Sequence, residues 1–156
     1  MIKPKVFITR RWPKEAEERL KKIFDVTLNQ DDKVLSKNEI AEGFYNHDAL
    51  ACTVSDTIDE SIIKSGKTGK GKIIANFGVG FNHIDLKACK KYKILVTNTP
   101  DVLTNATADL TILLMLMISR RSKEGEYEIE NNKWAGWRPT HLLGSELSDK
   151  TLGIIG

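Results

Sequence analysis

Short apolar or β-rich runs alternate with helix-like segments through the N-terminal part of the 156-residue chain. The most restrictive run is ALACTV at residues 49–54, which carries no charged side chain. Such a run is typical of a central strand of a parallel sheet, because that strand is buried on both faces. Alternating strands and helices with short connections predict a doubly wound α/β fold, a parallel sheet covered by helices on both faces. The strands are expected at residues 5–9, 26–28, 49–54, 72–75 and 93–96.

Several helix starts carry local signals. Pro13 suits the first turn of a helix, where its missing N–H is not needed. Ser36 and Glu39 fit a capping box, in which the side chain of each residue bonds the backbone of the other. Ile40 and Phe44 would then form the buried side of that helix. Further helices are expected at residues 59–63 and 84–90.

Residues 106–118 (ATADLTILLMLMI) are almost continuously apolar. A helix that is apolar on every side has to be buried on every side. Because a membrane span needs roughly 20 residues, this shorter segment is expected to be a core helix. Thr104 or Asn105 could cap it, and Asp109 places a carboxylate in its first turns, near the positive end of the helix dipole. The free N–H groups at that end would suit an anionic ligand, and an ordinary capped structural helix is the alternative.

Composition limits the expected partners. The net charge is only +3, and the 24 basic and 21 acidic residues are spread along the chain, which argues against nucleic acid and against a membrane surface. No secretory signal is recognised, since MIKP leads directly into a strand. Cys52 and Cys89 are therefore expected to be free thiols in a reduced, cytoplasmic setting.

Two motifs fail their own requirements. Residues 66–72 (GKTGKGK) are similar to a phosphate-binding P-loop, but Ile73 stands where Ser or Thr is needed, and a strand follows where a helix should. We expect a flexible basic loop there. The histidines His47, His83 and His141 lie far apart, with no Cys or carboxylate at ligand spacing, so no metal site is expected.

A glycine-containing turn at Gly78, Val79 and Gly80 follows one expected strand and precedes a helix. It would lie at the carboxyl edge of the sheet, where open α/β sheets bind ligands. It does not match a dinucleotide fingerprint, because His83 occupies the third glycine position. Glycines still let backbone N–H groups approach an anion closely, as in a nest, and a plain tight turn is the alternative.

Five segments along the chain together resemble the sequence of a known protein family. They are PKVFITR at 4–10, ANFGVGFNHID at 75–85, VTNTPDVLTNATADL at 96–110, WAGWRPTHLLG at 134–144 and KTLGIIG at 150–156. In this order they resemble the D-2-hydroxyacid dehydrogenase family, and most of all its glyoxylate/hydroxypyruvate reductase branch. Family members are considerably longer, so the resemblance implies that this chain is a truncated part.

The resemblance implies a flavodoxin-like substrate-binding domain over residues 1–100. Residues 101–156 would hold an interdomain helix, a dimerisation segment, and the first helix and first strand of an incomplete Rossmann-type NAD(P)-binding domain. Trp134 and Trp137 resemble residues with which relatives embrace a second subunit, so a homodimer is expected. The alternative is that both tryptophans cover the core of their own domain.

Substrate-binding roles also follow from the resemblance. The backbone amides of Val79 and Gly80, in the turn after Gly78, would hold the carboxylate of a small 2-oxo or 2-hydroxy acid. Val54 would line the same pocket, and Ser55 lies beside it.

Thr104 resembles a position that meets NAD or NADP near the nicotinamide, and Gly156 resembles the first glycine of the dinucleotide fingerprint. The family's substrate-orienting Arg, its catalytic His and the Glu partner would lie beyond the chain end. The resemblance therefore predicts an oxidoreductase acting on the CH–OH group of 2-hydroxy acids, first of all a glyoxylate/hydroxypyruvate reductase. The 156-residue chain alone is expected to be inactive, because it encodes neither a cofactor site nor a proton donor.

Two alternatives stay open. One is phosphoglycerate dehydrogenase, within the same family. The other is a non-catalytic flavodoxin-like module that binds a carboxylate or dimerises. Without a second domain the apolar helix would face water and the last strand would be an unpaired edge, so we expect aggregation or dimerisation of the isolated chain.

Overall fold

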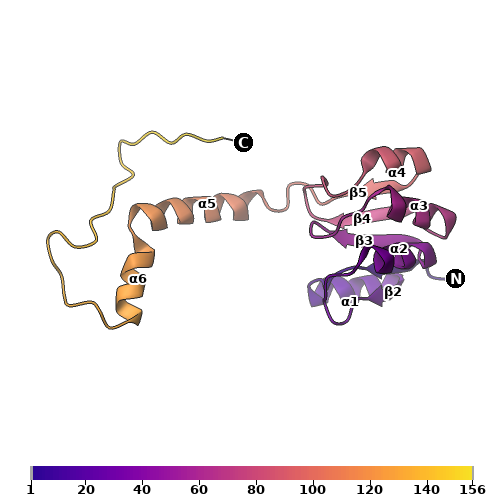
Figure 1. Ribbon diagram of the computed structural model, residues 1–156, viewed down its shortest axis with the longest axis horizontal. Helices are drawn as coiled ribbons and strands as arrows, with labels where there is room; N and C mark the ends of the chain where they lie inside the picture. The colour runs from indigo at the N-terminus through magenta and orange to yellow at the C-terminus, as the bar shows by residue number, and fades with distance from the viewer. Residues whose placement is uncertain (1, 156) are drawn as a thin grey trace. The chain divides into compact units, whose positions relative to one another are not determined.

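Five strands of the computed structural model, which describes residues 2–155, form one all-parallel sheet (Figure 1). The sheet belongs to the first of two units into which the chain divides, Met1–Val102 and Leu103–Gly156. Its strand order, β2-β1-β3-β4-β5, confirms the predicted flavodoxin-like fold. The strands are β1 (Lys5–Ile8), β2 (Asp25–Leu28), β3 (Ala49–Thr53), β4 (Ile73–Phe77) and β5 (Leu95–Thr97).

Helices cover both faces of this sheet, and they create two separate cores. On one face Phe44 packs with Leu50 and Cys52 of β3. On the other face Leu20 packs against a cluster that contains Ala51. Consecutive residues of β3 thus enter different cores, because successive side chains of a strand point to opposite faces. The first face carries α2 (Lys37–Asn46), α3 (Glu60–Thr68) and α4 (Leu86–Tyr92), and the second carries α1 (Lys14–Ile23).

The face beside α1 keeps an open apolar groove of about 710 Å³. Small side chains make its floor, because Ala49 and Ala51 of β3 and Ala75 of β4 fill little space above the sheet. Trp12 and Leu20 form part of its wall.

The local helix signals behave as predicted at α2. The Glu39 N–H donates to Ser36 Oγ at 3.3 Å, and the Ser36 N–H donates to Glu39 Oε2 at 2.8 Å. The capping box is thereby confirmed, as is the burial of Ile40 and Phe44. Pro13 immediately precedes α1, one position before its first turn.

Two connections differ from the prediction. α3 continues to Thr68 and Gly66 is buried, so the flexible loop expected from residue 66 is wrong at its start. The helix extends because Gly66 has no Cβ and can lie directly against the ring of Phe44. Lys93 has a left-handed φ of 56° that ends α4, and β5 consequently starts at Leu95 instead of residue 93.

The second unit contains α5 (Thr104–Ser119) and α6 (Ser122–Glu130). The predicted apolar helix does form, but no residue of α5 is buried. α6 buries no residue either, so this unit by itself does not provide the burial expected for α5. The exposure of α5 agrees with the expectation that this helix faces water without a second domain. The expected cap is wrong: α5 follows Leu103 without a side-chain cap, and Thr104 already lies in the first turn.

The predicted last strand does not form in residues 151–155. A strand needs a neighbour to pair its backbone N–H and C=O groups. Gly156 lies outside the described residues. Across residues 2–155, no helix has both the length and the apolar character needed to cross a membrane.

Candidate functional site

Two loops follow neighbouring strands at one edge of the sheet. Val54 and Ser55 come directly after β3, and the turn from Gly78 to Gly80 comes directly after β4. Because β3 and β4 pair in parallel, both loops leave the carboxyl edge, where open α/β sheets bind ligands. The loops also touch, since a Cβ atom added to Gly78 would stand 2.7 Å from Cγ1 of Val54. The structure thus brings the predicted substrate-binding residues to one place.

Asparagine side chains hold the carbonyl groups of the turn. Nδ2 of Asn76 donates to the C=O of Gly78 at 3.1 Å and to that of Gly80 at 2.8 Å. Nδ2 of Asn98 donates to the C=O of Val79 at 2.9 Å. Within residues 2–155, the N–H groups of Val79 and Gly80 have no acceptor, and a Cβ added to Gly80 would meet only open space. The turn therefore presents two unpaired donors beside an open surface, and such donors can bind an anion.

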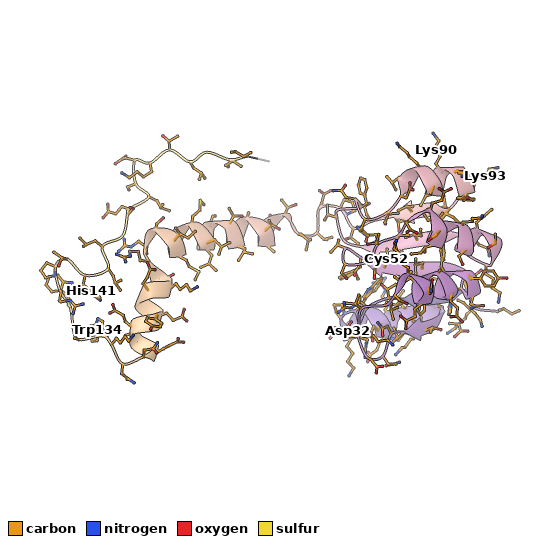
Figure 2. The ribbon with its side chains drawn as sticks, viewed as in Figure 1. Asp32, Cys52, Lys90, Lys93, Trp134 and His141 are labelled. Atoms are coloured by element: carbon orange, nitrogen blue, oxygen red, sulfur yellow. The ribbon has the colours of Figure 1, made fainter. Side chains whose placement is uncertain are left out.

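Asn76 also links the turn to His83. Oδ1 of Asn76 lies 3.1 Å from Nε2 of His83, and Sγ of Cys52 lies 3.9 Å away. Because the Asn76 amide group faces two carbonyls, its oxygen faces the ring, so a neutral His83 carries its proton on Nε2. Burial lowers the pKa of His83 and so favours this neutral form. The nearby charge of Asp56 acts in the opposite direction and is the smaller effect. Burial raises the pKa of Cys52 to about 12, so the thiol inside the sheet and helix layers of Figure 2 stays protonated.

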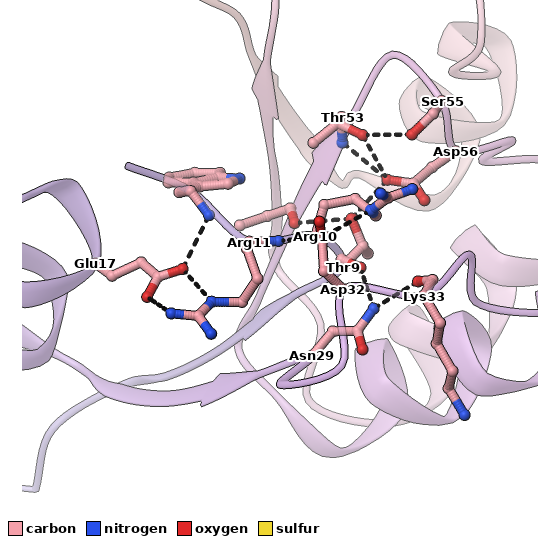
Figure 3. Close-up of polar contacts among 12 residues, drawn as sticks. Thr9, Arg10, Arg11, Glu17, Asn29, Asp32, Lys33, Thr53, Ser55 and Asp56 are labelled. Carbon is pink, nitrogen blue, oxygen red and sulfur yellow. Dashed lines mark hydrogen bonds and ion pairs between the residues drawn. The ribbon is translucent and has the colours of Figure 1, made fainter. Parts of the chain in front are cut away.

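A buried carboxylate fixes the loop after β3 (Figure 3). Oδ2 of Asp56 accepts from the hydroxyl of Thr9, at the end of β1, and from the N–H of Thr53 at 2.8 Å. The hydroxyls of Thr53 and Ser55 lie 2.8 Å apart. Val54, held between these bonded residues, is 61% exposed and turns its side chain outward. The loop is therefore rigid at its base and apolar at its tip.

The arginines near the same edge are already paired. Arg11 makes a two-pronged ion pair with Glu17, through Nε at 2.7 Å and Nη2 at 2.8 Å (Figure 3). The hydrogen bond from Arg11 lowers the pKa of the buried Glu17 carboxyl. Nε of Arg10 donates to Asp32 at 2.9 Å. Both cations are thus already paired, and neither is available in this arrangement as a counter-ion for a substrate.

Sequence reasoning missed Asn76 and Asn98. A signal was present for Asn76, because asparagine is depleted from strands, and this one stands inside β4. A buried amide needs several partners, which indicates that nearby backbone groups depend on it. Asn98 carries no comparable signal, since it follows β5 in an irregular segment.

In the second unit, the described residues that are predicted to contact cofactor or a partner subunit are exposed. Thr104 is exposed at the start of α5, and Gly156 lies outside the described residues. Trp134 and Trp137 are 55% and 82% exposed, so neither side chain covers a core within this unit by itself. Nε2 of His141, which is labelled in Figure 2, lies 2.7 Å from Oε2 of Glu128. In residues 2–155, no group of three or more His, Cys, Asp or Glu side chains is placed to hold a metal ion.

Comparisons with known proteins agree with one another. The family model described as D-isomer specific 2-hydroxyacid dehydrogenase, catalytic domain, matches residues 6–151. A glyoxylate reductase of Thermococcus litoralis is 39% identical over 159 aligned positions, which cover 99% of this chain and 47% of that protein. A crystal structure assigned to the D-isomer specific 2-hydroxyacid dehydrogenases, from Polaromonas, is 36% identical with a TM-score of 0.88, and the match covers 96% of this chain and 46% of that one.

A more distant neighbour is an NAD⁺-bound 3-phosphoglycerate dehydrogenase of Entamoeba histolytica. It is 31% identical with a TM-score of 0.65, and the match covers 76% of this chain and 40% of that one. The chain spans about half the length of the curated relatives that it matches.

Proposed function

Because the chain belongs to the D-isomer specific 2-hydroxyacid dehydrogenase family, we propose that it supplies the substrate-binding part of an NAD- or NADP-dependent reductase of small 2-oxo acids. Glyoxylate and hydroxypyruvate are the favoured substrates, since glyoxylate reductases of two Thermococcus species are among its relatives. The observation that carries the proposal is the pair of unpaired N–H groups at Val79 and Gly80, on the carboxyl edge of the sheet. Residues 1–100 would form the substrate-binding domain, and residues 101–156 would begin the cofactor-binding domain.

The proposed role of the site is to bind and orient the substrate. The N–H groups of Val79 and Gly80 would donate to the carboxylate of the 2-oxo acid, and a charged acceptor strengthens such bonds. Gly78 would allow the turn to approach Val54, whose side chain would cover the substrate and exclude water, with Ser55 at the pocket rim. Fixing the carboxylate at one end would hold the C2 carbonyl in a defined direction, which lowers the entropic part of the barrier.

A nicotinamide dinucleotide would supply the hydride that reduces the C2 carbonyl. The donor chemistry at the start of α5 fits part of such a group, because the first N–H groups of a helix lack intrahelical acceptors and no side chain caps them here. Thr104 would contact the cofactor there, and Gly156 would begin its glycine-rich loop. The exposed Trp134 and Trp137 would contact a second subunit of a homodimer, in a cytoplasmic enzyme.

Glyoxylate titration of the ¹⁵N-labelled chain tests the binding step. We expect the amide signals of Val79 and Gly80 to move in a saturable manner, while that of Gly125 in α6 stays in place. A mild non-ionic detergent would cover α5 during the titration. Absence of any saturable shift at the turn would overturn the substrate-binding role.

Activity is tested with the protein isolated from its source and with this chain alone. We expect the protein from the source to oxidise NADH or NADPH with glyoxylate or hydroxypyruvate, and this chain to match the no-protein blank. Faster turnover of 3-phosphohydroxypyruvate would favour phosphoglycerate dehydrogenase. Binding without reduction of any 2-oxo acid would favour the non-catalytic module.

A further inference from the structure

The turn from Gly78 to Gly80 owes its donor direction to groups that lie outside it. In a planar trans peptide unit, the C=O of one residue and the N–H of the next point in opposite directions. Fixing the Gly78 carbonyl therefore fixes the Val79 N–H, and fixing the Val79 carbonyl fixes the Gly80 N–H. Asn76 holds the first carbonyl and Asn98 holds the second.

The two asparagines are not equivalent. The Gly78 carbonyl has a second donor, the N–H of Thr99 at 3.1 Å, in addition to Asn76. Among the described residues, Asn98 is the only donor to the Val79 carbonyl. Loss of Asn98 should therefore release one peptide unit completely, whereas loss of Asn76 should release the other only in part.

Asn76 is built into the fold more deeply than Asn98. It is 3% exposed and sits opposite Cys52 in the β3–β4 register. Its amide group donates to two carbonyls, and its oxygen faces His83. A buried amide this fully bonded has one orientation, because rotating it would place its donors against a donor and its acceptor against acceptors.

We propose that Asn76 and Asn98 are positioning residues, which aim the N–H groups of Val79 and Gly80 at the substrate carboxylate by holding the preceding carbonyls inward. This inference rests on the proposed function of the turn. Neither side chain needs to touch the substrate. Their effect on binding passes through the direction of two peptide units.

The test compares three variants of the ¹⁵N-labelled chain. Asn98→Ala removes the one hydrogen-bond donor to the Val79 carbonyl among the described residues. Asn76→Asp keeps the shape of Asn76 but replaces its donors by an acceptor, and it is preferred to Asn76→Ala, which would leave a cavity. Asn46→Ala is the matched control, since Nδ2 of Asn46 also donates to a backbone carbonyl, that of Glu42 at 3.1 Å, in α2.

The expected result for Asn98→Ala is glyoxylate binding weakened about tenfold or more, as when a hydrogen bond to a charged group is lost. The Gly80 amide should no longer shift with glyoxylate, while the Val79 amide still does. Asn76→Asp should reduce the shift of the Val79 amide and leave that of Gly80 in place, and it should weaken binding less than Asn98→Ala, because Thr99 still holds the Gly78 carbonyl. Asn46→Ala should bind as the unmodified chain does. Equal affinity of all forms within twofold would overturn the inference.

A ligand-free measurement separates this inference from the proposed function. The ¹H–¹⁵N NOE of the Gly80 amide should fall in Asn98→Ala and stay unchanged in Asn46→Ala. If the unmodified chain binds no glyoxylate but the NOE falls, the proposed substrate is wrong and the positioning of the turn stands. If the NOE of Gly80 is unchanged in both turn variants, the positioning role is wrong, whatever the chain binds.

Discussion

The two units use similar apolar residues with opposite results. In α3, Ile62 and Ile63 are completely buried, whereas Leu113 and Leu114 of α5 are each about half exposed. Within residues 2–155, no residue beyond Ile94 is buried. Apolar side chains gain stability only when another apolar surface removes them from water, and the sheet provides that surface in the first unit alone. An apolar helix thus forms a core only when a second apolar surface packs against it.

Helix ends show the same contrast. Side chains cap three helices of the first unit, α2, α3 and α4, through Ser36, Asp59 and Asp85, whereas α1 has no side-chain cap. Neither α5 nor α6 has a side-chain cap. Local signals and packing therefore support each other in the first unit, which is the condition for a single well-defined fold.

Amide hydrogen exchange should show the largest difference between the units. Amides of β3 and β4 should exchange only through global unfolding, and those of α5 through local opening, with rates that differ by about three orders of magnitude or more. Exchange read residue by residue by NMR measures this. Protection of α5 that rises with protein concentration would show that copies of the chain cover this helix. Equal protection of α5 and β3 in dilute solution would contradict the comparison.

Truncation of one buried and one exposed side chain gives the next largest effect. Phe44→Ala removes a fully buried ring and should lower the free energy of unfolding by about 3–5 kcal/mol. Leu113→Ala, on the exposed surface of α5, should change it by less than about 0.5 kcal/mol. Urea unfolding followed by circular dichroism measures both. A loss at Leu113 as large as that at Phe44 would mean that α5 is part of the cooperative core.

Adding a methyl group should have opposite signs in the two units. In Gly66→Ala the new Cβ would overlap the buried ring of Phe44, which should cost about 1–3 kcal/mol. In Gly125→Ala the new Cβ would stand 3.7 Å from Cδ1 of Leu142, an ordinary contact. Alanine favours a helix over glycine by up to about 1 kcal/mol, so α6 should gain helicity. Calorimetry would measure the stability of Gly66→Ala, and the helical signal in circular dichroism would measure the helicity of Gly125→Ala. A gain in stability in Gly66→Ala would contradict the close packing of Gly66 against Phe44.

Much of the first unit could be predicted from the residues. The apolar run over 49–54 indicated a central parallel strand, and Ser36 and Glu39 indicated a capped helix, because both signals are local. The order of the strands needed the family resemblance. The start of β5 was misplaced because Lys93 adopts a left-handed conformation that no local pattern announces.

The site was predicted in part. The position of the turn from Gly78 to Gly80 follows from sequence alone, since it lies between a strand and a helix. The hydrogen bonds that hold it do not, because Asn98 reaches Val79 across 19 residues of chain and only the folded sheet brings them together. The apolar sequence of α5 likewise indicates that the helix needs a partner surface, but it carries no information on where that surface is.

The smallest effect concerns a helix cap and depends on pH. Asp59 caps α3 by accepting from the N–H groups of Ser61 and Ile62, and it pairs with Lys37 at 2.6 Å. The hydrogen bond from Lys37, with that from Ser61, lowers the pKa of the Asp59 carboxyl to about 2 from an ordinary value of 3.8. Asp59→Ala should cost about 1 kcal/mol at neutral pH. Thr104→Ala, in the uncapped first turn of α5, removes no cap and should raise the stability of that helix by a few tenths of a kcal/mol, because alanine favours a helix more than threonine does.

The sign of the pH effect follows from the depressed pKa of Asp59. The folded state binds the proton less readily than the unfolded chain, so the charged carboxylate contributes its full stability above about pH 4. That contribution should decline as the pH falls through about 2. Asp59→Asn keeps an acceptor for the cap without the charge, so the difference in unfolding free energy between it and the unmodified chain should shrink over this range. Urea titrations at several pH values measure that difference, and a gap that stays constant down to pH 2 would show that the charge of Asp59 does not stabilise the start of α3.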